Sequence, residues 1–272
     1  MGFEFFKKFF EQKQEDNRKF TDEEAEKIIS EKINIDSISQ KIRIDLPLTS
    51  REQVVKSLSR LCLELKDKAV NYDTILSDDA SGRFVSLFLK KMIDKKRSEQ
   101  KKPKTKIFFL PGRYIYDDDF QPSKPSRLSL DSYDPIEKFV ESKKYSIKKA
   151  LVSTEFISSG YTIKRIVDIL EDAGVDFDIA ALSLKWGPQY FDPRIGARLI
   201  YGNVDSVGRD AFYKADFLGV HKIQTIGEDK SNKPYINNKL IRKPADPELI
   251  RAARRDVETL TQELLPLWEH NT

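Results

Sequence analysis

The 272-residue chain predicts an α/β fold, a parallel sheet with helices on both faces and helical extensions at both ends. Short apolar segments alternate with amphipathic ones through the middle of the chain, which is typical of strands joined by crossover helices. Hydrophobic residues make up 39% of the chain and aromatic residues 11%, enough for a buried core. No internal repeat competes with this interpretation.

The first 49 residues are expected to form a helical extension that ends in a strand. Phenylalanines recur at helical spacing over the first ten residues, which predicts a short amphipathic helix. Docking on the protein or on a second subunit is favoured over a membrane surface. Thr21 and Glu24 have the spacing of a capping box, so a second helix is expected over 22–32. The alternation over 41–49 then predicts a strand.

Residues 50–245 are expected to form the α/β domain. In chain order, the patterns predict a helix that Ser50 caps, a second helix, an irregular segment with a short helix, and a third helix that Gly174 ends. The helices are expected over 50–68, 83–95, 135–143 and 163–173, the irregular segment over 111–147, and the strands over 73–77, 106–110, 150–153 and 177–184.

Residues 185–245 are rich in aromatic residues and glycine, and they are expected to add a hood to the domain. Candidate strands in the hood lie over 197–201 and 217–223. Asp246 and Pro247 begin a long helix in a separate C-terminal segment, 246–272. The apolar stripe of this helix favours a core contact or a dimer seam over a site that recruits another protein.

Composition excludes several classes of protein. The chain has 48 Lys and Arg against 44 Asp and Glu, and a net charge of +4 does not suit a strongly basic nucleic-acid binder. No apolar segment approaches a membrane span and no signal peptide is evident, so a cytoplasmic location is expected. Cys62 is the single cysteine, and the two histidines are His221 and His270. These counts exclude an intrachain disulfide and a thiolate or histidine-rich metal site.

The segment over 150–162 contains the clearest functional pattern. An apolar strand leads through Glu155 into a turn of small residues and then into a helix. Such a turn lies beyond the carboxyl end of its strand, where N–H groups and the helix dipole favour a phosphate monoester. Gly160 lets the backbone approach that group, and an acid just before the turn suits sugar hydroxyls. The alternative is an ordinary strand-to-helix turn of another doubly wound fold. Hydroxyl donors come from Ser158, Ser159 and Thr162.

This segment resembles the signature of the type I phosphoribosyltransferases, which runs as an apolar strand, two acids, two apolar residues, small hydroxyl residues, Gly, any residue, and Thr or Ser. The chain reads Ala-Leu-Val-Ser-Thr-Glu-Phe-Ile-Ser-Ser-Gly-Tyr-Thr from 150 to 162. The resemblance implies that Glu155 holds the ribose hydroxyls. Thr154 stands in place of the first acid and brings no charge, a departure that bears on catalysis more than on binding. The residues implied to bind the 5′-phosphate of phosphoribosyl pyrophosphate are Ser158, Ser159, Gly160, Tyr161 and Thr162.

The resemblance covers about residues 72–184 and implies two further parts of a site. The loop after the first strand would contact pyrophosphate through Ser81, Gly82 and Arg83, and Asp78 or Asp79 would help to hold Mg²⁺. The simpler interpretation of this loop is a helix N-cap made by Asp79 or Ser81. The segment over 111–134 takes the place of the family's mobile loop. Its candidates to close over pyrophosphate are Arg113, Lys124 and Arg127.

Two other clusters have both a functional and a structural interpretation. The lysines over 90–106 fit a nucleic-acid contact, but a solvated helix end is favoured because no aromatic residues lie among them. Aromatic residues of the hood fit either stacking on a nucleobase or ordinary packing. These residues are Trp186, Tyr190, Phe191 and Tyr201.

We therefore expect a protein that binds phosphoribosyl pyrophosphate with Mg²⁺ and transfers the phosphoribosyl group to a nitrogenous base. The resemblance makes Glu155 and Arg83 the catalytic candidates. One alternative is a regulatory module that senses phosphoribosyl pyrophosphate or a nucleotide without chemistry. Another is an interaction protein associated with nucleic acid. A homodimer is common in the family, and no membrane partner is expected.

Overall fold

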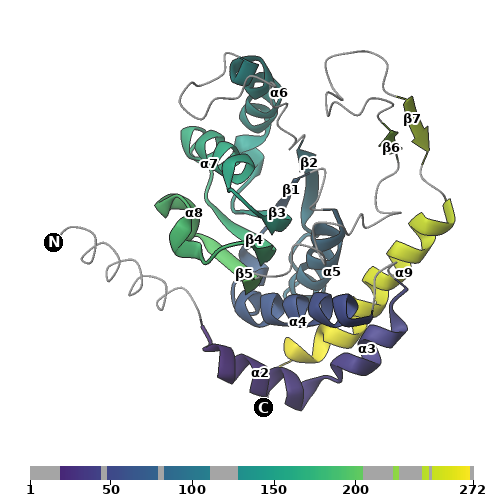
Figure 1. The fold of residues 1–272 in the computed structure, drawn as a ribbon. Coiled ribbons are helices and arrows are strands. Elements are labelled where there is room, and N and C mark those ends of the chain that lie inside the picture. The colour runs from purple at the N-terminus through teal and green to yellow at the C-terminus, as the bar shows by residue number, and fades with distance from the viewer. Residues whose placement is uncertain are drawn as a thin grey trace.

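Figure 1 shows the fold, a computed structural model in which residues 19–43, 48–78, 83–110, 128–204, 223–226, 241–244 and 247–269 are described. A five-stranded sheet lies at the centre, and all its strands are parallel. The α/β fold class expected from the sequence is therefore confirmed. The strands are β1 (Thr74–Asp78), β2 (Lys106–Leu110), β3 (Ala150–Ile157), β4 (Phe177–Leu184) and β5 (Leu199–Val204).

The strand order is β2-β1-β3-β4-β5. The chain moves outward from β1 to β2, returns to the other side of β1 at β3, and then continues away from β1 to β5. The order therefore reverses direction between β1 and β3. In open α/β sheets of this kind, ligands bind outside the carboxyl ends of the strands at such a reversal.

Helices cover both faces of the sheet. One buried apolar cluster joins α4 (Leu48–Leu65), α5 (Arg83–Glu99) and α9 (Pro247–Leu264) to strand residues such as Leu151. The other joins α6 (Leu128–Lys143), α7 (Tyr161–Asp172) and α8 (Pro193–Gly196) to the neighbours of Leu151 in β3, Ala150 and Val152. Successive side chains of a strand point to opposite faces, so this alternation is what a sheet buried on both sides requires.

The helical extensions pack together against α4. The chain begins its described part with α2 (Asp22–Lys32) and α3 (Ile35–Lys41), which lie beside α4 and α9 in Figure 1. The capping box is confirmed, because the Thr21 hydroxyl accepts from Glu24 N–H while the Glu24 carboxylate accepts from Thr21 N–H. At the other end, buried Trp268 donates through Nε1 to the Cys62 carbonyl at 2.6 Å.

The strand expected over 41–49 is wrong at both of its ends. Lys41 is the last residue of α3, and α4 already begins at Leu48, so Ser50 is not its cap; residues 44–47 lie outside the described part. Ile38 and Ile42 are buried on the core shared with α9. Ile38 lies in α3, whereas Ile42 is its C-cap with an extended backbone, so the helix ends where the alternating segment begins.

Other boundaries move by smaller amounts. The helix expected over 135–143 begins earlier, at Leu128, and part of the expected hood is β5 of the main sheet. A separate antiparallel pair is formed by β6 (Ile223–Ile226) and β7 (Ile241–Pro244). The amphipathic N-terminal segment, both histidines and residues 111–127 lie outside the described residues. The 3-10 helices are η1 (Ala69–Asn71), η2 (Lys144–Ser146), η3 (Pro188–Tyr190) and η4 (Leu265–Leu267).

Among the helices of the described segments, none combines the length and the hydropathy that crossing a lipid bilayer requires.

Candidate functional site

The candidate site lies where the strand order reverses, at the carboxyl ends of β1 and β3. The two strands pair in parallel, with Ser77 of β1 opposite Ser153 of β3. β1 ends one residue later, at Asp78, whereas β3 continues to Ile157. The loops that follow the two strands, which the sequence analysis assigned to pyrophosphate and to phosphate, therefore leave the sheet on adjacent strands.

Thr154 and Glu155 lie inside β3 and are not part of the turn after it. Thr154 pairs with Ala181 of β4, and its side chain is buried, as is that of Glu155 at 6% exposure. The expectation that the strand ends at Ser153 is wrong, because β4 extends alongside and pairs as far as Ile157 with Leu184. A buried carboxylate is costly unless it is paired or hydrogen-bonded, and Glu155 does interact with other groups of the protein.

The turn after β3 is short and leads directly into α7. It consists of residues 158–160, and Gly160 is the N-cap of the helix with a left-handed φ of +78°. Gly160 offers no capping side chain, and the first turn of α7 contains no acidic residue. The positive end of the helix dipole is thus not offset by an N-cap oxygen or a first-turn carboxylate, which favours an anion there.

The hydroxyl residues of this turn differ in exposure. Ser159 is exposed, whereas Ser158 and Thr162 are half-buried. Tyr161, the first residue of α7, has 55% of its surface exposed. The five residues of the expected phosphate cradle therefore lie at the N-terminus of α7, with Ser158 and Thr162 less exposed than Ser159 and Tyr161.

The segment after β4 packs against Gly160. A Cβ atom placed on Gly160 would lie 3.1 Å from Cδ1 of Phe191 and 3.8 Å from Cδ1 of Ile195. Both residues belong to the apolar cluster on the α7 face of the sheet. Glycine is thus favoured at position 160 for two reasons: the backbone has a positive φ, and Phe191 leaves little room for a Cβ atom.

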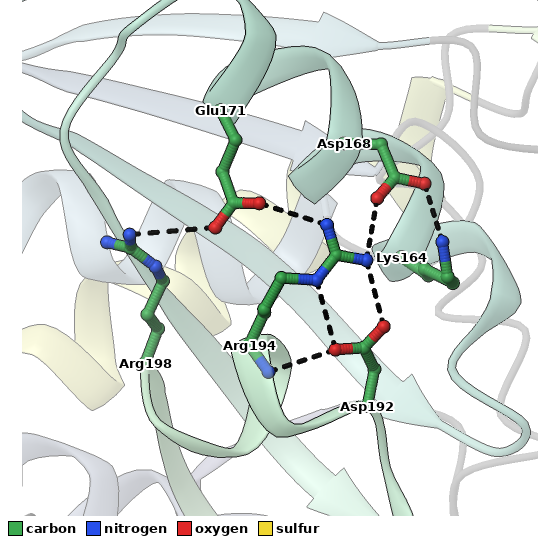
Figure 2. A network of polar contacts seen from close by, with 6 residues as sticks. All are labelled: Lys164, Asp168, Glu171, Asp192, Arg194 and Arg198. Atoms are coloured by element: carbon green, nitrogen blue, oxygen red, sulfur yellow. Dashed lines mark hydrogen bonds and ion pairs between the residues drawn. The ribbon is translucent and has the colours of Figure 1, made fainter.

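A polar network holds this segment to α7 (Figure 2). The Arg194 guanidinium contacts Asp168 at 2.9 Å and Glu171 at 3.0 Å on α7, and Asp192 at 2.9 Å on its own segment. Hydrogen bonds from Arg194 lower the pKa of Asp192, and the same bonds raise that of Arg194. The remaining members of the network are Lys164, which pairs with Asp168, and Arg198, which pairs with Glu171.

The loop after β1 is described only at its two ends. Asp78 closes β1, its side chain is not described, and Asp79, Ser81 and Gly82 lie outside the described residues. Arg83 is the first residue of α5, and its guanidinium lies 4.5 Å from the centre of the Phe109 ring. Phe109 belongs to β2, so this contact draws Arg83 toward the side of β1 that faces away from β3.

The aromatic residues of the expected hood separate into two pairs. Trp186 and Tyr190 are exposed by 46% and 71%, with their rings 6.3 Å apart. They follow Lys185, whose N–H donates to the Ile157 carbonyl, so this pair begins beside the end of β3. The other two, Phe191 and Tyr201, pack against the apolar cluster on the α7 face. For them the packing interpretation is confirmed.

The donors near the reversal point suit Mg²⁺ only in part. Mg²⁺ favours one or two carboxylates together with phosphate oxygens and water. Asp78 and Glu155 lie on adjacent strands, but Ser77 pairs with Ser153, so Asp78 is level with Thr154 and Glu155 is at a position that faces the other side of the sheet. Within the described segments, no group of three or more metal-ligating side chains is found, so a protein-only metal cage is not supported there.

No pattern in the sequence predicts the Arg194 network or the contact of Phe191 with Gly160. Asp192 followed by Pro193 is a local signal for a helix start, and α8 does begin there. Its contacts with α7 join residues distant in the chain and have no local signature. Comparison with protein-family models, with curated proteins and with solved structures finds no match to this chain.

Proposed function

We propose that this protein binds phosphoribosyl pyrophosphate with Mg²⁺ where the strand order reverses and transfers the phosphoribosyl group to a nitrogenous base. The observation that carries the proposal is the reversal between β1 and β3, which coincides with the segment that resembles a phosphoribosyltransferase signature. The sequence motif and the strand order thus indicate the same edge of the sheet.

The residues present suit the parts of such a ligand. The N-terminus of α7, free of an N-cap carboxylate, favours the 5′-phosphate, and the half-buried hydroxyls of Ser158 and Thr162 add donors. Glu155 lies two residues before the end of β3, and the resemblance assigns the ribose hydroxyls to it. Bound Mg²⁺ would offset the charge of the departing pyrophosphate. Orientation of the sugar between these groups is the main contribution expected of the chain itself.

Release of pyrophosphate tests the proposal. The protein is incubated with phosphoribosyl pyrophosphate, Mg²⁺ and a panel of purine and pyrimidine bases, and pyrophosphate is measured. Glu155→Gln should lower the rate by about 100-fold, since orientation effects of this size follow from losing one positioning contact. Glu26→Gln, which changes an exposed carboxylate on α2, should leave the rate unchanged. Failure of the protein to bind phosphoribosyl pyrophosphate in calorimetry would contradict the proposal.

A second candidate function follows from Thr154. It occupies the place of an acid in the resemblance, it is 1% exposed, and it brings no charge to the site. A module that senses phosphoribosyl pyrophosphate without transferring the sugar would need only the phosphate contacts. Calorimetric binding that Ser158→Ala weakens, without pyrophosphate release for any base, would favour the sensor over the enzyme.

A further inference from the structure

The amino ends of β1, β2 and β3 form a second functional candidate, on the edge of the sheet opposite the proposed site. Two chain segments meet there, residues 95–106 at the end of α5 and residues 143–149 around η2. Together they contain eleven Lys and Arg and one acid, a net charge of +10. Carboxylates outside the two segments offset part of this charge, because Lys144 pairs with Glu141, and Lys149 pairs with Asp176 and Asp178.

Hydrogen bonds between the segments fix their proximity. The Asp73 carboxylate, just before β1, accepts from the N–H of Lys148 at 3.1 Å, and the Asp73 carbonyl accepts from the N–H of Lys106 at 2.9 Å. Lys106 also donates through Nζ to the Ser146 carbonyl at 3.3 Å. Lysines that lie far apart in the sequence therefore share one surface.

A buried arginine holds the first segment in place. Arg97 is 6% exposed and donates to the carbonyls of Pro103, Val70 and Tyr72 at 2.7, 2.9 and 3.0 Å. The Arg97 guanidinium thus binds backbone carbonyls and is not exposed to solvent. These hydrogen bonds anchor the loop that follows α5, so the exposed lysines of that loop are held at one edge of the protein.

The exposed lysines of this edge are not neutralised by carboxylates of the described residues. On α5 itself, Lys90, Lys91 and Lys96 pair with Asp94, Glu258 and Glu99, as expected for a solvated helix. Within the described part of the chain, the exposed lysines of the two segments form no ion pair with a carboxylate. We name these seven the basic edge: Lys95, Lys101, Lys102, Lys104, Lys106, Lys143 and Lys148.

Tyr145 stands within the basic edge and is 94% exposed. It lies on η2 between Lys144, whose Nζ is 5.4 Å from the centre of its ring, and Ser146. The sequence analysis favoured a solvated helix end because no aromatic residue lies among the lysines of 90–106. Tyr145 supplies the missing ring from the other segment.

We propose that the basic edge binds single-stranded nucleic acid through its phosphate backbone, with one base stacked on Tyr145. A line of unneutralised cations with an aromatic ring among them is the pattern of sequence-independent single-strand binding. A membrane-binding helix would present several large apolar residues beside its cations. Tyr145 is the single large apolar side chain that the described part of these two segments exposes. Charge and ring together therefore favour a nucleic acid over a lipid surface.

Fluorescence anisotropy with labelled oligonucleotides tests the proposal on the full chain. The probes are oligo-dT and oligo-U of about 20 nucleotides and a duplex of the same length. Binding of both single strands is expected, weakened by roughly 100-fold between about 50 and 200 mM salt if about five phosphates are contacted. Tyr145→Ala should weaken single-strand binding by about 5-fold or more, since stacking contributes about 1–3 kcal/mol per base.

A matched pair of double variants isolates the basic edge. Lys102→Gln with Lys104→Gln should lower the affinity for oligo-U by about 10-fold or more, because two phosphate contacts are lost. Lys27→Gln with Lys56→Gln removes the same charge from exposed positions on α2 and α4 and should change little. Circular dichroism and melting curves must match those of the wild type for each variant.

Four results would overturn the proposal. One is no single-strand binding at low salt, and another is equal loss of affinity in the two double variants. The third is sedimentation with phosphatidylserine vesicles in the absence of oligonucleotide binding, which would assign the edge to a membrane surface. In the last, the protein binds the duplex as tightly as the single strands, and Tyr145→Ala does not change the affinity. That result would exclude stacking of a base on Tyr145 and with it the preference for a single strand. Because the proposed phosphoribosyl site lies at the other end of the strands, Glu155→Gln should leave oligonucleotide binding unaffected, so the two proposals fail separately.

Discussion

Gly160 and Gly174 lie on either side of α7 and provide a matched test of how the proposed phosphate turn is built. Both have left-handed backbones, with φ of +78° and +68°. An alanine pays about 1–2 kcal/mol to adopt this conformation. A Cβ on Gly174 meets no atom within 4 Å, so the conformational cost is the whole expected effect of Gly174→Ala.

Gly160→Ala adds a steric term to the same conformational cost. Its Cβ would lie 3.1 Å from Cδ1 of Phe191, which must move by a few tenths of an ångström. Phe191 is half-buried and can give way in part, so we expect about 1 kcal/mol beyond the loss in Gly174→Ala. For a domain of this size, that difference corresponds to about 2–4 °C in Tm.

Urea unfolding followed by circular dichroism measures the two free energies of unfolding. Adding Phe191→Ala to both glycine variants should abolish the excess in Gly160→Ala, because the side chain that the methyl group meets is then gone. Equal stability of Gly160→Ala and Gly174→Ala would refute the close packing of the turn. If the proposed function is right, Gly160→Ala also weakens phosphoribosyl pyrophosphate binding, whereas Gly174→Ala does not.

Three further predictions concern the core. Gly202→Ala should cost about 3 kcal/mol or more in urea unfolding, since its Cβ would overlap the backbone carbonyl of Ser57 on α4. Tyr72→Phe removes a 2.7 Å hydrogen bond to Asp178 and should cost about 1–2 kcal/mol at neutral pH. Burial, and after it Asp178, raise the pKa of Tyr72 above its ordinary 10.0. The stabilisation by the Tyr72 hydroxyl is therefore complete below about pH 10 and is lost progressively as the pH rises above it. A difference in unfolding free energy between wild type and Tyr72→Phe that stays the same at higher pH would contradict this. Burial raises the pKa of the Cys62 thiol, so an aromatic disulfide reagent should label it only on unfolding, and fast native labelling would count against the buried position.

Local chemistry determined several elements of this protein. The capping box of Thr21 and Glu24 needs only residues three apart, and Gly174 ends α7 because glycine adopts φ of +68° without strain. β2 and β4 have the predicted boundaries, since each is a short, mostly apolar segment bounded by turn residues. The segment of the candidate site, 150–162, was likewise evident as a strand, a turn and a helix.

The order of the strands and the shape of both proposed sites depend on contacts between residues far apart in the chain. β3 extends through Thr154 and Glu155 because β4 lies beside it, and no signal within β3 itself shows this. Ile38 and Ile42 pack on the core shared with α9, and helices end at Lys41 and begin at Leu48, inside the segment 41–49 whose alternation predicted a strand. Tyr145 joins the lysines after α5 only because β1 pairs with both β2 and β3. Pairing across the sheet and packing between layers thus determined the strand boundaries, the choice between helix and strand, and which segments meet, because the periodicity of a single segment does not fix these.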